Sequence, residues 1–286
     1  MPHPQSPLAT TGSGLDAFLA TAVAAARAAG DVIRDGAANR ASLAIERKRA
    51  NDFVSVVDKG AERAILDVIG RAHPDHAFHA EETGESSDAA SASHVWLIDP
   101  LDGTTNFLHG IPHYCVSIGL KRDGDMVVGV VYDPISERLF TATKGGGAYL
   151  DGERIRVSTR ESLAESVIGT GIPFSDLSFI DAYMGSLRTI ASRSAGIRRA
   201  GAAALDLAYV AAGWLDGFWE KNLNPWDVGA GAILIEEAGG VITDFSGGRT
   251  HVDTGQAVAG APGVHRALLD VIAEFPALAA PRRPRE

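Results

Sequence analysis

The chain has 286 residues, a hydrophobic fraction of 45% and a formal net charge of −10, which describes a globular protein with enough apolar residues for a sizeable core. The acidic balance argues against a general nucleic-acid binder. The single cysteine, Cys115, excludes an intramolecular disulfide framework and favours a reducing, cytoplasmic compartment. No apolar run is long enough to span a bilayer, so no membrane association is expected.

Both ends of the chain have the composition of disordered segments. Residues 1–14 are rich in Pro, Ser, Thr and Gly, and residues 281–286 form a Pro/Arg tail. The start also lacks the basic and apolar regions of a signal peptide. We expect one domain over residues 15–280, with two subregions at about 15–155 and 156–280.

The first half of the chain predicts two helices and two strands. The helices cover Leu15–Asp35 and Lys59–Ala72, with Asp58 as the N-cap of the second. A short strand follows at Ala77–Ala80. The next strand, Val95–Ile98, is apolar throughout, so it should be a central strand buried on both faces that stops at Asp99-Pro100.

The middle of the chain predicts an antiparallel meander, because β-rich runs alternate with Gly, Asp and Pro turn signals. Its strands are Tyr114–Leu120, Met126–Tyr132, Arg138–Thr143 and Ala148–Leu150. Beyond it, helices alternate with short strands. The helices are Ser178–Ser192, Ala203–Ala212, Trp226–Ala238 and Gly263–Phe275, and the strands are Val167–Thr170, Asp216–Glu220, Val241–Asp244 and Ala257–Ala259. The whole is an α/β architecture.

Carboxylates stand at the ends of apolar elements in three separate stretches. They are Glu81 and Glu82 after one strand, Asp99 and Asp102 after the next, and Asp227 in the first turn of a helix. Rigid elements can aim such groups into one crevice. Four carboxylates in one pocket cannot all remain ionised without a cation. Hard oxygen donors without His or Cys favour Mg²⁺, Mn²⁺ or Ca²⁺, with Mg²⁺ the best match.

The segment Asp99–Thr105 adds a second signal. Asp102, Gly103 and Thr104 can form a tight turn that opens a short helix, whose free N–H groups attract phosphate. Asp-Pro and Asp-Gly pairs are also ordinary loop punctuation, so neither signal decides the function by itself. Together, metal carboxylates beside an anion-binding turn favour phosphoryl chemistry.

Several long motifs resemble the inositol monophosphatase family over about residues 15–275. They are Ala80-Glu81-Glu82, Trp96–Phe107 (WLIDPLDGTTNF), Trp226–Gly231 (WDVGAG) and Glu237–Gly240 (EAGG). The stretch Gly201–Gly213 is similar to the bacterial branch. The resemblance implies a layered αβαβα sandwich, two or three Mg²⁺ ions per site with Mn²⁺ as a substitute, inhibition by lithium, and a homodimer.

The resemblance also implies roles for individual residues. The implied metal ligands are Glu81, Asp99, the Leu101 carbonyl, Asp102 and Asp227. Asp58 and Glu82 would surround Thr104 and orient the attacking water. The implied substrate contacts are Gly103, Thr104, Gly201, Ala202, Ala203, Glu220 and Lys48. Ala202 departs from the many relatives that carry Ser or Thr there, and Lys48 could equally be a solvated lysine.

The implied reaction is hydrolysis of inositol monophosphate, a small phosphorylated metabolite, by in-line attack of a metal-activated water, with no phosphoenzyme. Histidinol phosphate or another small sugar or alcohol phosphate stays open as the substrate. A haloacid-dehalogenase-type mechanism is disfavoured, because two residues rather than one separate Asp99 from Asp102. A regulatory, partner-binding protein that keeps the fold is the alternative from another class.

Other candidates have ordinary structural interpretations. Cys115 should be a small buried residue rather than a nucleophile. His109 and His113 should be structural or surface residues. Glu236 and Glu237 fall too far along their helix to join Asp227 at its start.

Overall fold

The computed structural model describes residues 14–40, 45–49, 52–172 and 176–280. Its helices are α1 (Leu15–Ala38), α2 (Val56–Ala72), α3 (Thr104–His109), α4 (Ile180–Arg193), α5 (Ala203–Ala211), α6 (Pro225–Glu237), α7 (His251–Thr254) and α8 (Pro262–Ala273). Its strands are β1 (Ile45–Arg49), β2 (Asp52–Ser55), β3 (Ala77–Ala80), β4 (Gly84–Glu85), β5 (His94–Asp102), β6 (Cys115–Arg122), β7 (Asp125–Asp133), β8 (Arg138–Thr143), β9 (Gly147–Leu150), β10 (Glu153–Arg154), β11 (Val167–Thr170), β12 (Gly196–Arg198), β13 (Gly217–Lys221), β14 (Val241–Thr243) and β15 (Gln256–Gly260).

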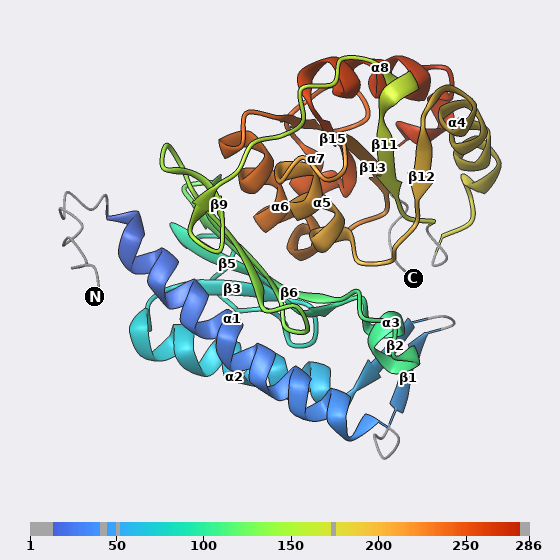
Figure 1. Ribbon diagram of the computed structural model, residues 1–286. Coiled ribbons are helices and arrows are strands. Elements are labelled where there is room, and N and C mark those ends of the chain that lie inside the picture. The colour runs from blue at the N-terminus through green and yellow to red at the C-terminus, as the bar shows by residue number, and fades with distance from the viewer. Residues whose placement is uncertain (1–13, 41–44, 50–51, 173–175, 281–286) are drawn as a thin grey trace, which may run out of the picture.

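The elements stack in five layers, which confirms the predicted αβαβα sandwich (Figure 1). Helices α1 and α2 cover one face of an eight-stranded sheet with the order β10-β9-β8-β7-β6-β5-β3-β4. Helices α5 and α6 fill the space between that sheet and a five-stranded sheet with the order β12-β11-β13-β15-β14. Helices α4 and α8 form the last layer.

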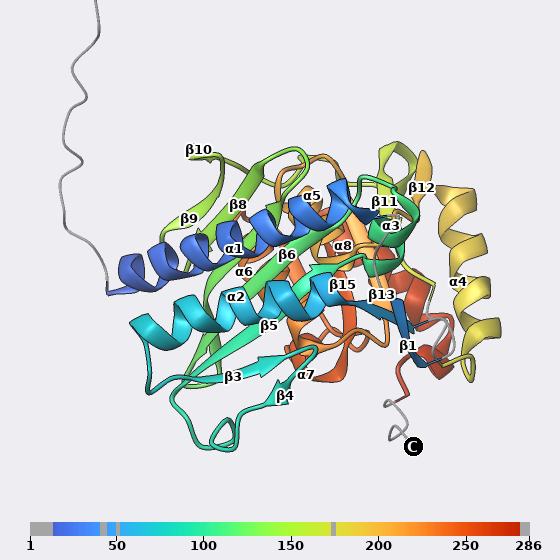
Figure 2. The ribbon, with the colours of Figure 1, turned by 90° about the horizontal axis from the view of Figure 1, so that it is seen from below.

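The first layer packs closely because its helices present small residues to the sheet. Figure 2 shows α1 and α2 lying side by side across the strands. Ala22, Ala25, Ala26 and Ala29 of α1 have no exposed surface. An apolar face with this helical spacing is what the sequence predicted for Leu15–Asp35, and the helix continues three residues further to Ala38.

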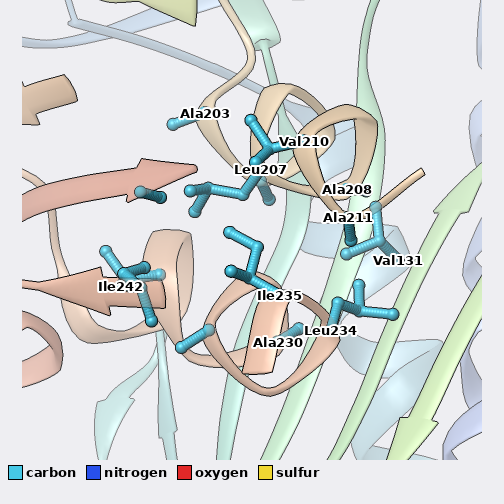
Figure 3. Packing of buried hydrophobic residues seen from close by; sticks show 14 of the residues in the cluster. Val131, Ala203, Leu207, Ala208, Val210, Ala211, Ala230, Leu234, Ile235 and Ile242 are labelled. Carbon is cyan, nitrogen blue, oxygen red and sulfur yellow. The ribbon is translucent and has the colours of Figure 1, made fainter. Parts of the chain in front are cut away.

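The central layer is almost wholly apolar. Residues such as Leu207, Val210, Leu234 and Ile235 interlock between the two sheets (Figure 3). At Gly129 of β7, an added Cβ would lie 2.6 Å from the Ala230 carbonyl oxygen, so α6 approaches the sheet backbone directly. This contact fixes the position of α6, whose first turn carries Asp227.

The strand predictions hold with small shifts at the ends. Arg138–Thr143 and Val167–Thr170 match β8 and β11 at both ends, and the antiparallel meander from β6 to β9 is confirmed. The predicted boundary near residue 155 falls between the two sheets. The single-domain assignment stays a prediction, and the ends predicted to be disordered lie outside the described residues, Gly14 excepted.

Two predictions of element ends were wrong. Strand β5 does not stop at Asp99-Pro100 but pairs with β6 as far as Asp102, through a bulge. Helix α2 begins at Val56, so Asp58 lies inside its first turn rather than at the N-cap, and its side chain is fully buried. Strands β1 and β2, which precede α2 directly, were not predicted.

None of the helices in the described part of the chain is both long enough and apolar enough to cross a membrane.

Three histidines stack at the far end of α2, between it and the start of β5. The ring centroids of His73 and His76 are 4.7 Å apart, and those of His76 and His94 are 4.4 Å apart, with nearly parallel planes. Trp96 Nε1 donates a hydrogen bond to His76 Nδ1 at 3.1 Å, so that nitrogen carries no proton. Phe18 of α1 packs edge-on against His73. The stack therefore joins α1, α2 and β5 through packed aromatic rings.

Protonation of His73 and His76 is disfavoured in the stack. Burial, followed by the nearby His94 and His73 rings, lowers the pKa of His76 to about 4, although Asp75 acts in the opposite direction. Burial and His94 also lower the pKa of His73. An unfolded chain binds a proton on histidine near pH 6.5. Stability from the stack is therefore present above about pH 6.5 and is lost as the pH falls towards about 4, because the unfolded state then binds more protons.

We predict that replacing His76 with Asn flattens the acid side of the stability profile. The amide oxygen can still accept from Trp96, but the titrating ring is gone. The thermal midpoint of His76→Asn should be lower than that of the wild type at pH 7, where the stacking is lost, and should fall less steeply from pH 6.5 to 4. Melting curves across this range test it, with the exposed His109→Asn as the control. Parallel profiles for His76→Asn and the wild type would contradict the prediction.

Candidate active site

The predicted acidic stretches meet at one edge of the eight-stranded sheet. Strands β3 and β5 are parallel neighbours, and Ala80, the last residue of β3, lies opposite Ile98 of β5. The Glu81 N–H donates to the Ile98 carbonyl at 3.1 Å, which ties the end of β3 to β5 just before Asp99. From β6, the Ser117 hydroxyl donates to the Trp226 carbonyl at 3.0 Å and fixes the start of α6 at the same place.

A β-bulge brings Asp99 and Asp102 to the same side. Asp99 lies opposite Ser117 of β6 and Asp102 opposite Cys115, so two residues of β5 face one of β6. In a regular strand, residues three positions apart face opposite sides. The extra residue breaks this alternation, and both carboxylates experience the negative charge of Asp227.

Burial and the crowding of like charges together determine the electrostatics of the site. Burial raises the pKa of Asp99 well above its usual range, and Glu81, Asp102 and Asp227 raise it further. Burial and Asp227 raise the pKa of Asp102 to about 7, although the Ala204 N–H, which donates to its Oδ2 at 2.7 Å, acts the other way. A bound cation would offset this concentration of negative charge.

The carboxylates surround a shared space without meeting at one point. Within the described residues, no three Asp, Glu, His or Cys side chains converge closely enough to form a finished metal cage. Repulsion between like charges favours this separation. Asp227 is held in place by a capping box, in which its Oδ2 accepts from the Asn224 N–H at 2.7 Å.

Thr104 begins α3 beside these acids and contacts two of the predicted residues. Its hydroxyl lies 2.9 Å from Asp58 Oδ1 and 3.1 Å from the Leu101 carbonyl oxygen. Gly103, which precedes it, has a φ of 93°, in the left-handed region that favours glycine. A Cβ at Gly103 would also lie 3.0 Å from the His113 carbonyl oxygen and 3.2 Å from the Ala202 Cβ. The predicted tight turn opening a short helix is therefore present.

The segment Gly201–Ala203 lies against this turn. Asn106 of α3 is buried, and its Nδ2 donates to the Ala200 carbonyl at 2.9 Å and to the His113 carbonyl at 2.7 Å. The predicted substrate segment is thus fastened to the turn by a side chain that the sequence analysis did not single out.

Glu220, at the end of β13, faces the same acidic region. Burial raises its pKa well above the usual range, and Asp206 and Asp227 raise it further, while Arg199 has the opposite effect. Glu220 therefore extends the acidic lining from the eight-stranded sheet to the five-stranded sheet.

His113 and Asp206 form a pair that sequence reasoning missed. His113 is half-buried, and its Nε2 lies 3.3 Å from Asp206 Oδ1, within ion-pair distance. Burial favours the neutral ring, but Asp206 outweighs it and raises the pKa of His113. The only sequence signal for Asp206 was its place in the Gly201–Gly213 stretch.

Three further candidates have other positions or other roles. Lys48 is in β1, and its side chain is not among the described ones. Glu237 closes the β8–β9 turn, where its carboxylate accepts from the N–H groups of Gly145 and Gly147. Cys115 is buried, as predicted. Burial and the neighbouring aspartates raise the pKa of its thiol, which keeps it protonated and a poor nucleophile.

Known proteins share both the sequence and the fold of this chain. The Nus factor SuhB of Pseudomonas aeruginosa is 45% identical over 258 residues, which cover 89% of this chain and 95% of that protein. The inositol-1-monophosphatase of Rhizobium meliloti is 46% identical over 231 residues, 81% of this chain and 86% of that protein. The crystal structure of the extragenic suppressor protein suhB from Bartonella henselae aligns with a TM-score of 0.86 at 41% identity, covering 90% and 98% of the two chains.

The family model described as the inositol monophosphatase family matches residues 15–275. This range includes every described side chain of the candidate site and both sheets. The chain belongs to the inositol monophosphatase family.

Proposed function

We propose that this protein is a Mg²⁺-dependent phosphomonoesterase that hydrolyses inositol monophosphate to inositol and phosphate. The observation that carries the proposal is the gathering of buried, mutually repelling carboxylates beside the hydroxyl of Thr104. Family membership supports phosphatase activity, and the R. meliloti relative is named for the inositol phosphate reaction. Lithium inhibition, a homodimer and a cytoplasmic location belong to the same proposal.

The residues of the site fit a hard divalent cation. The donors that would hold it are all oxygens, namely Glu81, Asp99, the Leu101 carbonyl, Asp102 and Asp227, which matches Mg²⁺ with Mn²⁺ as a substitute. The raised pKa values of Asp99 and Asp102 add to the fit, because both carboxylates are buried next to other carboxylates, whose repulsion a cation would offset. When bound, two or three such ions would make a water nucleophilic at neutral pH and stabilise charge on the leaving oxygen.

Thr104 is placed to orient the attacking water. Its hydroxyl proton is directed to Asp58 Oδ1, which leaves the oxygen lone pairs to accept a hydrogen bond from water. We assign Asp58 the role of fixing that direction and Glu82, beside Glu81, the role of accepting the proton of the water. In this proposal, the backbone N–H groups of Gly103 and Thr104 bind the phosphate.

The substrate alcohol would lie between the turn and the second sheet. Glu220 is a hydrogen-bond acceptor for ring hydroxyls at the end of β13. Gly201–Ala203 offers backbone groups on the other side, and Ala202 supplies no hydroxyl. Lys48 stays a proposed phosphate contact. The same arrangement suits histidinol phosphate, which is why a substrate screen is needed.

A second function is favoured by the names of the relatives. Proteins called Nus factor SuhB match this chain as closely as the named phosphatase does. We propose as the alternative that this chain also binds a protein partner as a regulatory factor, and we keep the expectation that it does not bind nucleic acid directly. A pull-down with an inactive but folded variant separates this role from catalysis.

A substrate screen tests the main proposal. Phosphate release should be greatest with inositol monophosphate, require Mg²⁺, stop on chelation and fall with lithium. Histidinol phosphate, fructose 1,6-bisphosphate and phosphoadenosine phosphate are the comparison substrates. Phosphate release that is unaffected by chelation would contradict the proposed metal-dependent chemistry. A clear preference for histidinol phosphate would keep the chemistry but make histidinol phosphate the proposed substrate.

We predict that Asp102→Asn and Asp227→Asn lose turnover while remaining folded. Changes in the outer shell of a metal site reduce activity about 10–100-fold, so loss of a ligand should exceed that. Asp102→Asn also removes one charge from a repelling cluster, so the metal-free variant should melt no lower than the wild type at pH 8. Phosphate release and melting temperature are the measurements, with the exposed Asp125→Asn as the control. Near-normal turnover in either variant would remove that residue from the site.

We predict that Thr104→Ala lowers kcat by about 10²–10⁴-fold, the usual contribution of a positioned proton-transfer group. KM should change much less, because the side-chain hydroxyl acts on the water rather than on the substrate. Thr104→Ser keeps the hydroxyl and should stay closer to the wild type. Steady-state kinetics at saturating Mg²⁺ measure kcat and KM of both variants. Equal activity in the Ala and Ser variants would show that the reaction does not use the hydroxyl.

A further inference from the structure

One face of α2 carries two buried carboxylates. Asp58 has no exposed surface and Glu62 is 2% exposed. They lie four residues apart, so they occupy the same face of the helix, separated by a rise of about 6 Å. A buried carboxylate is unfavourable unless hydrogen bonds compensate it, so each must have partners in the fold. Asp58 contacts Thr104, and Glu62 contacts a different part of the site.

Glu62 binds the segment that carries the acidic pair Glu81 and Glu82. Its Oε2 accepts the backbone N–H of Glu82 at 2.8 Å, and its Oε1 accepts the hydroxyl of Thr83. The N–H of the preceding residue, Glu81, donates to the Ile98 carbonyl of β5. Three consecutive residues are therefore each fixed by one hydrogen bond, two of them to a single buried side chain.

These hydrogen bonds hold residues 81–83, which belong to neither of the strands that they connect. Strand β3 ends at Ala80 and β4 begins at Gly84, so residues 81–83 form the connection between two antiparallel strands. Thr83 is exposed at the surface. A short exposed connection does not by itself hold a side chain in one direction. Here the buried carboxylate of Glu62 fixes the connection through its two hydrogen bonds.

We propose that Glu62 is a positioning residue that holds Glu81 and Glu82 in the direction required for binding divalent cations. The inference rests on the proposed function and adds a residue to it. Helix α2 then acts as a spacer between two parts of the site, because Asp58 sets the Thr104 hydroxyl and Glu62 sets the Glu81-Glu82 pair. Because one helix carries both Asp58 and Glu62, the Thr104 hydroxyl and the Glu81-Glu82 pair cannot move far relative to one another.

The test is Mg²⁺ binding to the full-length chain, measured by titration calorimetry with the metal alone. Glu62→Met has a similar volume but accepts neither hydrogen bond. We expect its Mg²⁺ affinity to fall about 10–100-fold, the usual effect of removing an outer-shell partner. The Mg²⁺ concentration for half-maximal turnover should rise in parallel, whereas kcat at saturating Mg²⁺ should change less.

Glu62→Gln is the conservative variant. Its amide oxygen can accept from the Glu82 N–H, and its amide nitrogen can donate to the Thr83 hydroxyl, which also serves as an acceptor. We expect it to recover most of the affinity that the Met variant loses. The exposed Glu165→Met is the matched control and should bind Mg²⁺ like the wild type.

Two results would overturn the inference. One is wild-type Mg²⁺ affinity in a folded Glu62→Met protein, even if it melts at a lower temperature, because Glu62 would then only stabilise the fold. The other is a Gln variant as weak as the Met variant. If Glu62→Met does not fold, the Mg²⁺ affinity of Thr83→Val is measured instead. An affinity equal to that of the wild type would then overturn the inference. Absence of Mg²⁺ binding by the wild type would instead reject the proposed function, so the two failures are distinguishable.

Discussion

Repulsion among buried carboxylates at the bulged end of β5 is the constraint on which the rest of this structure depends. Asp99 and Asp102 could face opposite sides of a regular strand, but the bulge turns both towards Asp227. The resulting charge is unfavourable in the isolated chain. The apolar layers around α6 hold the groups together against this repulsion, so packing far from the site maintains an arrangement that protonation or a bound cation would relieve.

This constraint also explains how far the sequence could predict the molecule. Apolar runs defined β8 and β11 at both ends, because strand length and side-chain alternation are local properties. The bulge was missed because Pro100 is an ordinary strand stop, and only pairing with Cys115 shows that β5 continues. The start of α2 was placed late because Asp58 is a good N-cap residue, whereas its burial against Thr104 is a tertiary contact.

The residues of the candidate site were also predicted only in part. Carboxylates at the ends of elements could be grouped from sequence, because parallel neighbouring strands such as β3 and β5 end at one edge. Asp206 and Glu62 lie inside helices, where a charged residue is normally assigned to the solvent-facing side. Their partners, His113 and the Glu82 N–H, come from segments distant in the sequence. No local pattern distinguishes these buried acids from exposed ones.

The similarity of this chain to both a Nus factor and a phosphatase does not force a choice between the two functions. Catalysis is proposed for the acidic residues of the candidate site, whereas the proposed partner binding would use the outer surface. Two relatives at 45% and 46% identity therefore cannot be ranked by overall similarity. The two roles proposed for this chain would then depend on different residues, namely the acids of the candidate site for catalysis and exposed faces of the outer helices for a partner. One fold is compatible with both, because function resides in the sites that a fold carries.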